Sequence, residues 1–179
     1  MTAPHYQTLA LIGVGLVGSS IARVARERKL AGKVLGFTPD VNERDIARGL
    51  NLADTYPETL AASVAGADLV VLAAPVGAFG AIAKEIGPHL KPGATVTDVG
   101  SVKTAVVRDV APHMPKGVHF IPGHPIAGTE QSGPKAGFAT LFDRRWCILT
   151  PLPGADAGAV ARLRTFWEAL GSSVEIMDP

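Results

Sequence analysis

Two short polar segments of the sequence carry side chains that could do chemistry, one containing Ser101 and the other containing His124. Histidine suits the removal of a proton from an alcohol, because its ordinary pKa lies near neutrality. His124 stands between Gly123 and Pro125, and we interpret this glycine-rich stretch as a loop rather than as core. Ser101 could orient the imidazole. The alternative is structural: a loop histidine hydrogen-bonded to backbone, and a serine that caps a helix.

A glycine turn near the start of the sequence is typical of nucleotide-binding proteins. It has the spacing G-x-G-x-x-G, follows an apolar strand predicted over residues 8–12 and opens a helix predicted over residues 16–30. The first glycine allows a tight bend, the second lets the backbone approach a pyrophosphate, and the third lets the helix pack on the strand. We therefore expect a dinucleotide to bind here, although glycines with a purely structural role would give the same spacing. The expected contacts are Gly13, Gly15, Leu16, Val17 and Gly18.

The choice between NAD and NADP is left open by the end of the next strand, predicted over residues 34–37. An acidic residue here would accept hydrogen bonds from the adenosine ribose, but the position holds Thr38. Its hydroxyl can bond a ribose hydroxyl or a phosphate oxygen without repelling a 2′-phosphate, and Arg44 is near enough to help. Asp40 could reach the ribose, but its place three residues before Glu43 favours a capping box at the start of a helix.

Strands and helices alternate along the rest of the chain. Further strands are predicted over 68–73, 94–98, 118–121, 146–150 and 173–176, helices over 40–49, 77–86, 103–110 and 157–170, and irregular chain over 122–145. This order implies an α/β fold: a doubly wound, mostly parallel Rossmann-type sheet with helices on both faces. Ala74 and Pro75 follow one strand and should line the cofactor crevice, or else simply end the strand. Ser101, at the same edge, could contact the nicotinamide, and Lys103 could face an anionic group.

Length and composition limit the functions that fit. The 179 residues suffice for one domain, with 47% hydrophobic and 18% charged residues as in an ordinary globular protein. A formal charge of +1 gives no reason to expect nucleic acid or a membrane surface as a partner. We expect no signal peptide, no membrane span and no metal site. The single cysteine, Cys147, fits a core position in a cytoplasmic protein.

Several segments together resemble the prephenate/arogenate (cyclohexadienyl) dehydrogenases of tyrosine biosynthesis. They are Ser101-Val102-Lys103, Gly-His-Pro-Ile-Ala-Gly-Thr-Glu at 123–130, and Ser132-Gly133. Residues 136–138 and 145–151 are similar to the bacterial cyclohexadienyl branch. The resemblance covers essentially the whole chain, and its specificity lies in the segments around Ser101 and His124.

The resemblance implies NAD(P)-dependent oxidative decarboxylation of prephenate, arogenate or both. His124 would accept the C4 hydroxyl proton as hydride leaves for the nicotinamide, and Ser101 would hydrogen-bond the histidine and help place the nicotinamide. Thr129 would lie beside this small-molecule substrate, and Glu130 in a polar network that gates the site. Residues 1–179 would form the dinucleotide-binding domain. The family's C-terminal helical domain, which forms the homodimer and supplies an arginine for the ring carboxylate, is expected to be absent, so that the isolated chain turns over weakly or not at all.

Two other functions fit the same fold. A reductase of β-hydroxyacids or imines would place a lysine at the centre of its site, and Lys103 is the nearby candidate. The segment around His124 would then be unexplained. A nucleotide-binding module without catalysis would need only the glycine turn.

Overall fold

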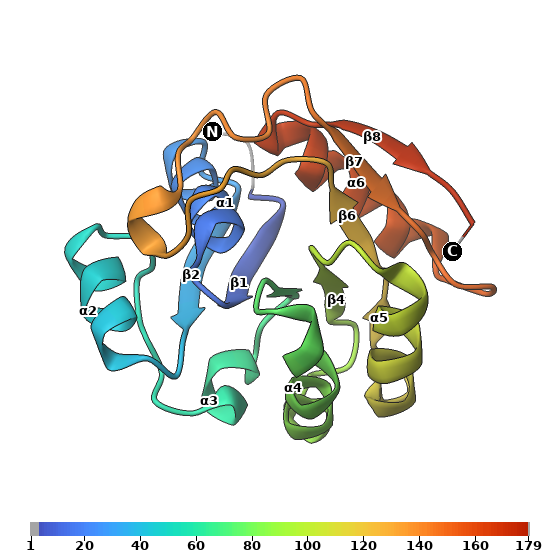
Figure 1. Ribbon diagram of the computed structural model, residues 1–179. Coiled ribbons are helices and arrows are strands. Elements are labelled where there is room, and N and C mark those ends of the chain that lie inside the picture. Colours follow the sequence, from blue (N-terminus) through green and yellow to red (C-terminus); the bar gives the residue numbers. More distant parts are fainter. Residues whose placement is uncertain (1–3, 179) are drawn as a thin grey trace.

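The computed structural model describes residues 4–178 and is built on a five-stranded parallel sheet (Figure 1). The strand order is β2-β1-β3-β4-β5. The strands are β1 (Tyr6–Ile12), β2 (Ala31–Phe37), β3 (Leu69–Leu72), β4 (Thr95–Asp98) and β5 (His119–Phe120). The chain order reverses between β1 and β3, which is where open parallel sheets bind their ligands. The predicted doubly wound α/β fold is confirmed.

Helices cover both faces of this sheet because the side chains of each strand point alternately to the two faces. Leu9 and Leu11 of β1 share a core with α1 and α6, whereas Ala10 and Ile12 share one with α3, α4 and α5 (Figure 1). The helices are α1 (Leu16–Glu27), α2 (Val41–Gly49), α3 (Leu60–Val64), α4 (Phe79–Ile86), α5 (Lys103–Val110) and α6 (Ala157–Leu170). This burial on both sides explains why β3, in the middle of the sheet, is a continuous apolar run.

The last two predicted strands exist but do not extend the central sheet. β7 (Trp146–Leu149) and β8 (Ser173–Ile176) form a separate three-stranded sheet with β6 (Gly123–Pro125), which runs antiparallel to β7. β6 lies inside the stretch that was expected to be irregular. The interpretation of His124 as a loop residue is therefore wrong, because His124 is the central residue of an edge strand. The strand forms by long-range pairing with β7, which leaves no local signal in its own residues.

Some helix ends also differ from the prediction, for local reasons. α1 ends at Glu27 rather than near residue 30, because Lys29 adopts a left-handed φ of 55° and turns the chain so that Leu30 is buried. The predicted helix over 77–86 begins with a 3-10 turn before α4. α3 has no counterpart in the prediction; the Thr59 side chain caps it by accepting the N–H of Ala62.

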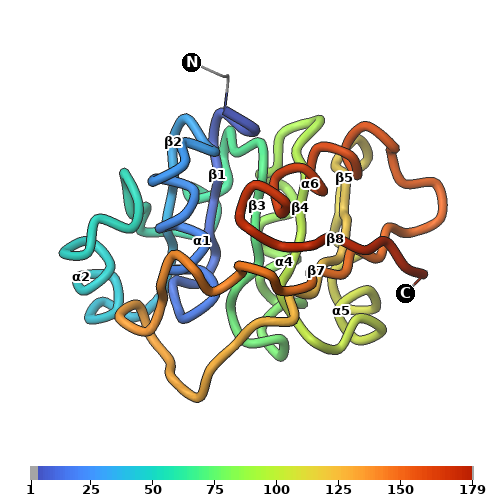
Figure 2. The backbone as a smooth tube through the Cα atoms, turned by 90° about the horizontal axis from the view of Figure 1, so that it is seen from above, coloured from blue at the N-terminus to red at the C-terminus, as the bar shows by residue number. Residues whose placement is uncertain are grey.

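The segment between β6 and β7 leaves the small sheet and crosses to α1 and α2, as the orange stretch of the tube shows in Figure 2. It docks on α1 at Gly137. A Cβ at this position would overlap the Ser19 hydroxyl and lie 2.8 Å from the backbone nitrogen of Ser20, so glycine is required there. The N–H of Phe138 donates to the Ser20 hydroxyl at 3.1 Å. These contacts fix the segment beside the first turns of α1.

The cysteine lies where the sequence indicates. Cys147 of β7 is fully buried, and burial raises the pKa of its thiol far above the usual range, so the side chain is an apolar core group. Over residues 4–178, we find no helix with both the length and the apolar character needed to cross a membrane.

Candidate active site

The glycine turn joins β1 to α1 at the edge of the central sheet where the strands end. Gly13 has a φ of 106°, and a Cβ there would lie 2.5 Å from the carbonyl oxygen of Ala73. A Cβ on Gly18 would overlap the carbonyl oxygen of Gly13. By contrast, a Cβ on Gly15 would meet no heavy atom within 4 Å. The fold itself therefore requires two of these glycines, whereas Gly15 keeps an open surface to which a ligand can come close.

The first turn of α1 presents backbone donors at this open surface. Gly15 is the N-cap of the helix and has no side chain to accept the N–H groups that follow, and the first turn holds no acidic residue. The hydroxyls of Ser19 and Ser20 point backward and donate to the carbonyls of Gly15 and Leu16. The N–H groups at the start of α1, together with the helix dipole, favour an anion such as a pyrophosphate.

At the end of β2, the side chain of Thr38 lies beside a carboxylate that comes from α2, that of Glu43. The hydroxyl of the buried Thr38 donates to Glu43 Oε2 at 2.9 Å and accepts the N–H of Asp40 at 3.3 Å. Asp40 caps α2 as predicted, since its Oδ1 accepts the N–H groups of Asn42 and Glu43. The second half of the predicted capping box is wrong, because the N–H of Asp40 is taken by Thr38. The Glu43 carboxylate is left beside Thr38, where a ribose contact was expected.

The buried carboxylate of Asp98, at the end of β4, bonds to both of the segments that carry Ser101 and His124. Asp98 Oδ2 accepts the N–H of Gly100 at 2.8 Å, and Asp98 Oδ1 accepts the N–H of Gly123 at 3.1 Å. Gly100 directly precedes Ser101, and Gly123 directly precedes His124. One side chain therefore ties together the backbones of two segments that are far apart in the sequence.

Lys103, in the first turn of α5, balances the charge of Asp98. Its Nζ donates both to Asp98 Oδ2 and to the carbonyl oxygen of Gly123. The Asp98 side chain is 0% exposed and that of Lys103 is 12% exposed. Burial raises the pKa of Asp98 and lowers the pKa of Lys103, and the attraction between the two groups opposes both shifts. The anion that Lys103 faces is thus the protein's own Asp98.

His124 lies on the open face of the three-stranded sheet. It pairs with Ile148 of β7, while its neighbours Gly123 and Pro125 are buried. Paired residues of antiparallel strands point to the same face. His124 therefore shares its face with Ile148 and with Trp146, which is 55% exposed. A ligand at this face could reach the imidazole.

The surroundings of His124 suit a proton acceptor. Partial burial lowers the pKa of the imidazole, the positive charge of Lys103 lowers it further, and Asp98 opposes both effects. In the part of the chain that the structure describes, neither ring nitrogen is engaged in a hydrogen bond with another residue. The neutral imidazole, which is the form that can take a proton, is favoured.

Ser101 lies in the turn between β4 and α5, and it is exposed. α5 begins at Lys103 with Val102 as its N-cap, and no side chain caps it, so the alternative in which Ser101 caps this helix is wrong. Within residues 4–178 the Ser101 hydroxyl has no protein partner, and the hydrogen bond to His124 implied by the resemblance is not made. The hydroxyl is available to a ligand.

The other predicted contacts divide into two groups. Ala74 and Pro75 follow β3 beside the glycine turn, where the backbones of β1 and β3 are paired up to Ile12 and Leu72. Pro75 is exposed at this edge.

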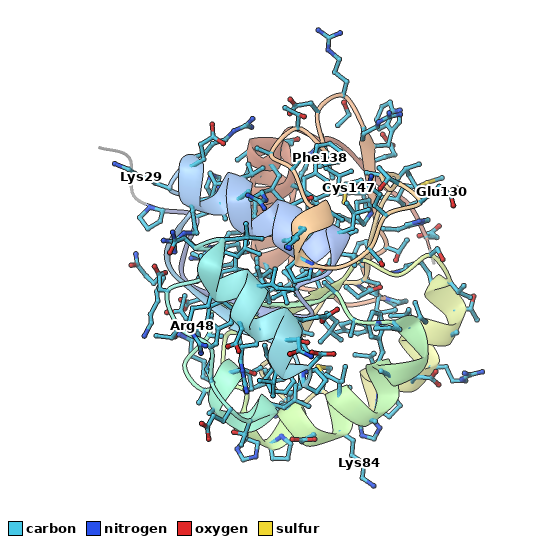
Figure 3. All side chains as sticks on the ribbon, turned by 60° about the vertical axis from the view of Figure 1, so that its left-hand side comes forward. Lys29, Arg48, Lys84, Glu130, Phe138 and Cys147 are labelled. Atoms are coloured by element: carbon cyan, nitrogen blue, oxygen red, sulfur yellow. The ribbon has the colours of Figure 1, made fainter. Side chains whose placement is uncertain are left out.

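Thr129 and Glu130 lie on an exposed stretch after β6. The hydroxyl of Thr129 accepts the N–H of Gln131 at 3.2 Å, and Figure 3 shows Glu130 at the periphery of the molecule. The structure does not bring these two side chains into contact with His124.

Comparison with known proteins places this geometry in a family. Residues 21–176 match the sequence model of the family described as prephenate dehydrogenase, nucleotide-binding domain. The chain belongs to that family. A cyclohexadienyl dehydrogenase from Zymomonas mobilis is 38% identical over 181 residues, which cover 96% of this chain and 58% of the relative.

Two solved structures of prephenate and arogenate dehydrogenases share the fold. Prephenate dehydrogenase from Aquifex aeolicus, in complex with hydroxyphenyl propionate and NAD+, has a TM-score of 0.89 at 33% identity and is covered over 61% of its length, against 100% of this chain. Arogenate dehydrogenase from Synechocystis has a TM-score of 0.88 at 30% identity, with 60% of its length and 96% of this chain covered. The chain thus spans less than two thirds of the length of these relatives.

Membership of the prephenate dehydrogenase nucleotide-binding domain family confirms the resemblance drawn from the segments around Ser101 and His124. Sequence reasoning missed Asp98, although a signal was present: an acidic residue in a buried strand needs a cationic partner, and Lys103 stands five residues later. The same pairing disfavours the reductase alternative, because a lysine held by a buried carboxylate is not free to act as the central catalytic group.

Proposed function

We propose that this chain is the dinucleotide-binding domain of an NAD(P)-dependent dehydrogenase that oxidatively decarboxylates prephenate, arogenate or both in tyrosine biosynthesis. The proposal is carried by the two segments that present Ser101 and His124, which Asp98 holds together through the N–H groups of Gly100 and Gly123 at the sheet edge where the glycine turn also lies. It is supported by membership of the family and by the names of the relatives.

The residues of this chain would divide the work as follows. The glycine turn and the first N–H groups of α1 bind the pyrophosphate, with Ala74 and Pro75 along the crevice. A bound nicotinamide dinucleotide supplies the hydride acceptor. His124 takes the proton of the ring hydroxyl as the carbon that bears this hydroxyl loses hydride. The exposed Ser101 hydroxyl orients the nicotinamide or the imidazole. The ring carboxylate then leaves as CO2, and the ring becomes aromatic.

The rest of the site would come from outside this domain. We propose that a helical domain supplies an arginine for the ring carboxylate, forms the homodimer of a cytoplasmic enzyme, and brings the substrate toward Thr129 and Glu130. The greater length of the relatives supports this proposal. A substrate brought by another domain would also account for the exposure of Thr129 and Glu130 in this structure.

Calorimetry and a steady-state assay test the proposal together. The 179-residue chain should bind NAD or NADP yet turn over prephenate and arogenate poorly, whereas the longest natural protein that contains it should turn over at least one of them. Oxidation of a β-hydroxyacid by that protein, without any of prephenate or arogenate, would contradict the proposed reaction. Full activity of the 179-residue chain would contradict the division between domains.

For the cofactor, we propose NAD rather than NADP. The Glu43 carboxylate lies against the Thr38 hydroxyl at the end of β2, where an acidic residue in such folds bonds the adenosine ribose. A carboxylate there accepts ribose hydroxyl protons and repels a 2′-phosphate. Glu43 would thus supply from α2 the acidic group that the β2 position lacks.

Glu43→Gln should therefore improve the binding of NADP relative to NAD. Removing one like charge near the 2′-phosphate should lower the Kd ratio of NADP to NAD by about tenfold, or ~1.4 kcal/mol. Asp45→Asn is the matched control, since Asp45 is on the same helix but pairs with Arg48 at 2.8 Å on its exposed side. Calorimetry with both cofactors measures the ratio, and an equal change in the two variants would argue against a ribose contact.

A further inference from the structure

We propose that Asp98 and Lys103 are positioning residues for His124. The pair holds both polar backbone atoms of Gly123 and thereby fixes the strand that presents the imidazole. We call the contacts of Asp98 and Lys103 with Gly123 the clamp. The predicted effect on turnover rests on the proposed function of His124 as the base, whereas the clamp does not.

The Asp98–Lys103 pair engages both polar backbone atoms of Gly123. Its N–H donates to Asp98 Oδ1 at 3.1 Å, and its carbonyl oxygen accepts from Lys103 Nζ. A Cβ on Gly123 would lie 2.9 Å from the backbone carbonyl oxygen of Asp98, so β6 is in close contact with the end of β4. β6 is three residues long and pairs with a strand on one side only. The Asp98–Lys103 pair supplies the restraint on its other side.

The free-energy cost of burying the Asp98–Lys103 pair indicates a role other than stabilising the fold. Burying two charges carries a desolvation penalty that apolar residues of similar volume would avoid, so a buried ion pair is weak evidence for stabilisation. An apolar pair, however, could not bond both backbone atoms of Gly123 or the N–H of Gly100. It also could not set the charge beside the imidazole. The geometry therefore points to control over where His124 lies and how readily it accepts a proton.

A second pair of the same chemistry lies at the opposite edge of the central sheet. Asp68 accepts the N–H of Thr8 at 2.8 Å and pairs with Lys91 at 2.7 Å, just before β3 and β4 begin. It also joins a carboxylate, a lysine and the backbone of a neighbouring strand. Because it is remote from His124, it provides an internal control for every variant of the Asp98–Lys103 pair.

Two charged groups act on the imidazole of His124 from neighbouring elements. β4 contributes Asp98 and α5 contributes Lys103. On β7 the neighbours are Ile148 and Cys147, and the raised thiol pKa keeps the cysteine neutral. The nearest charged residue of β8 in the pairing pattern is Glu175, which lies beyond Ile148. Changes at Asp98 or Lys103 should therefore be read directly in the titration of the imidazole.

Nuclear magnetic resonance titration of His124 in the 179-residue chain tests the electrostatic half of the proposal. Lys103→Met should raise the pKa of His124 because it removes a nearby positive charge, and Asp98→Asn should lower it because it removes a negative one. Lys91→Met should leave it unchanged. An unchanged His124 titration in folded Lys103→Met and Asp98→Asn would overturn this half.

Amide hydrogen exchange tests the positional half, and it uses a double variant because one unpaired buried charge could prevent folding. Asp98→Leu with Lys103→Met removes both charges and both acceptor oxygens, and exchange at the Gly123 N–H should accelerate by about tenfold or more, while Thr8 keeps its protection. Asp68→Leu with Lys91→Met, which removes the acceptor of the Thr8 N–H, should give the reverse pattern. Equal protection of Gly123 in the double variant and the wild type would overturn the clamp.

Turnover in the longest natural protein that contains the chain links the clamp to catalysis. Lys103→Met should lower kcat by about 100-fold through misplacement of the base, and should move the acid limb of the pH profile upward, with little effect on the KM for the dinucleotide. Lys103→Arg should restore part of the loss. If His124 is not the base, His124→Asn will leave turnover intact while the titration and exchange results stand. If the clamp is wrong, the titration and exchange results fail while His124→Asn still abolishes turnover.

Discussion

Replacing His124 with asparagine should remove most turnover and leave dinucleotide binding intact. Asparagine has a similar polar shape but cannot accept a proton near neutral pH. A general base contributes about 10²–10⁴-fold to the rate, so kcat should fall by about a thousandfold. Binding should persist because the glycine turn lies at β1 and α1, whereas His124 lies on β6. Steady-state kinetics of the longest natural protein that contains the chain, and calorimetry with NAD, measure the two effects.

The pH profile gives this prediction a second measure. The pKa of His124 is lowered, so the imidazole stays neutral to a lower pH than an ordinary histidine. The acid limb of kcat/KM, which falls as the base is protonated, should therefore lie below pH ~6.5, the ordinary value for histidine. The residual activity of His124→Asn should lack this limb.

His89→Asn is the matched control. His89 is exposed near the start of β4, at the opposite edge of the sheet, and should change neither kcat nor the pH profile. Wild-type kcat in His124→Asn would instead show that His124 is not the base.

The sequence predicted elements whose residues carry their own signal. α5 and α6 have the predicted bounds, because each is an amphipathic stretch that ends near turn residues. The last predicted strand, β8, is also confirmed in its bounds. β6 was missed because it has two residues of low strand propensity, Gly123 and Pro125, and exists only through its pairing with β7. Local patterns thus predicted the scaffold, whereas the strand that presents His124 depends on a long-range contact.

The candidate site divides in the same way. Residue type and position after predicted strands pointed to His124, because histidine can exchange protons near neutral pH, and to Ser101, whose hydroxyl can orient the imidazole or the nicotinamide. Their connection through Asp98 could not be predicted, because it depends on two glycine N–H groups meeting one carboxylate in three dimensions. Glu43 was likewise assigned to its helix cap by spacing. Its actual partner, Thr38, follows from the path of the chain after β2.

Changing the glycines of the turn one at a time should separate the folding of the turn from the approach of a ligand. Gly15→Ala should fold like the wild type, because its methyl group would meet no heavy atom within 4 Å. That same methyl group would occupy the surface where a pyrophosphate must contact the backbone. We expect the Kd for NAD to rise by about 100-fold, or ~2.7 kcal/mol, with an unchanged Tm. Calorimetry and thermal unfolding of the 179-residue chain give both quantities.

Gly18→Ala should fail for a different reason. Its Cβ would overlap the carbonyl oxygen of Gly13, so α1 must move away from β1. Such overpacking costs about 1–3 kcal/mol, which should lower the Tm as well as weaken binding. Gly49→Ala, in α2, has open space around its Cβ and should alter neither quantity by much. If Gly15→Ala bound NAD as tightly as the wild type, the pyrophosphate would have to lie elsewhere. A lowered Tm confined to Gly18→Ala, with binding lost in both variants, would show that the third glycine shapes the turn and the second receives the ligand.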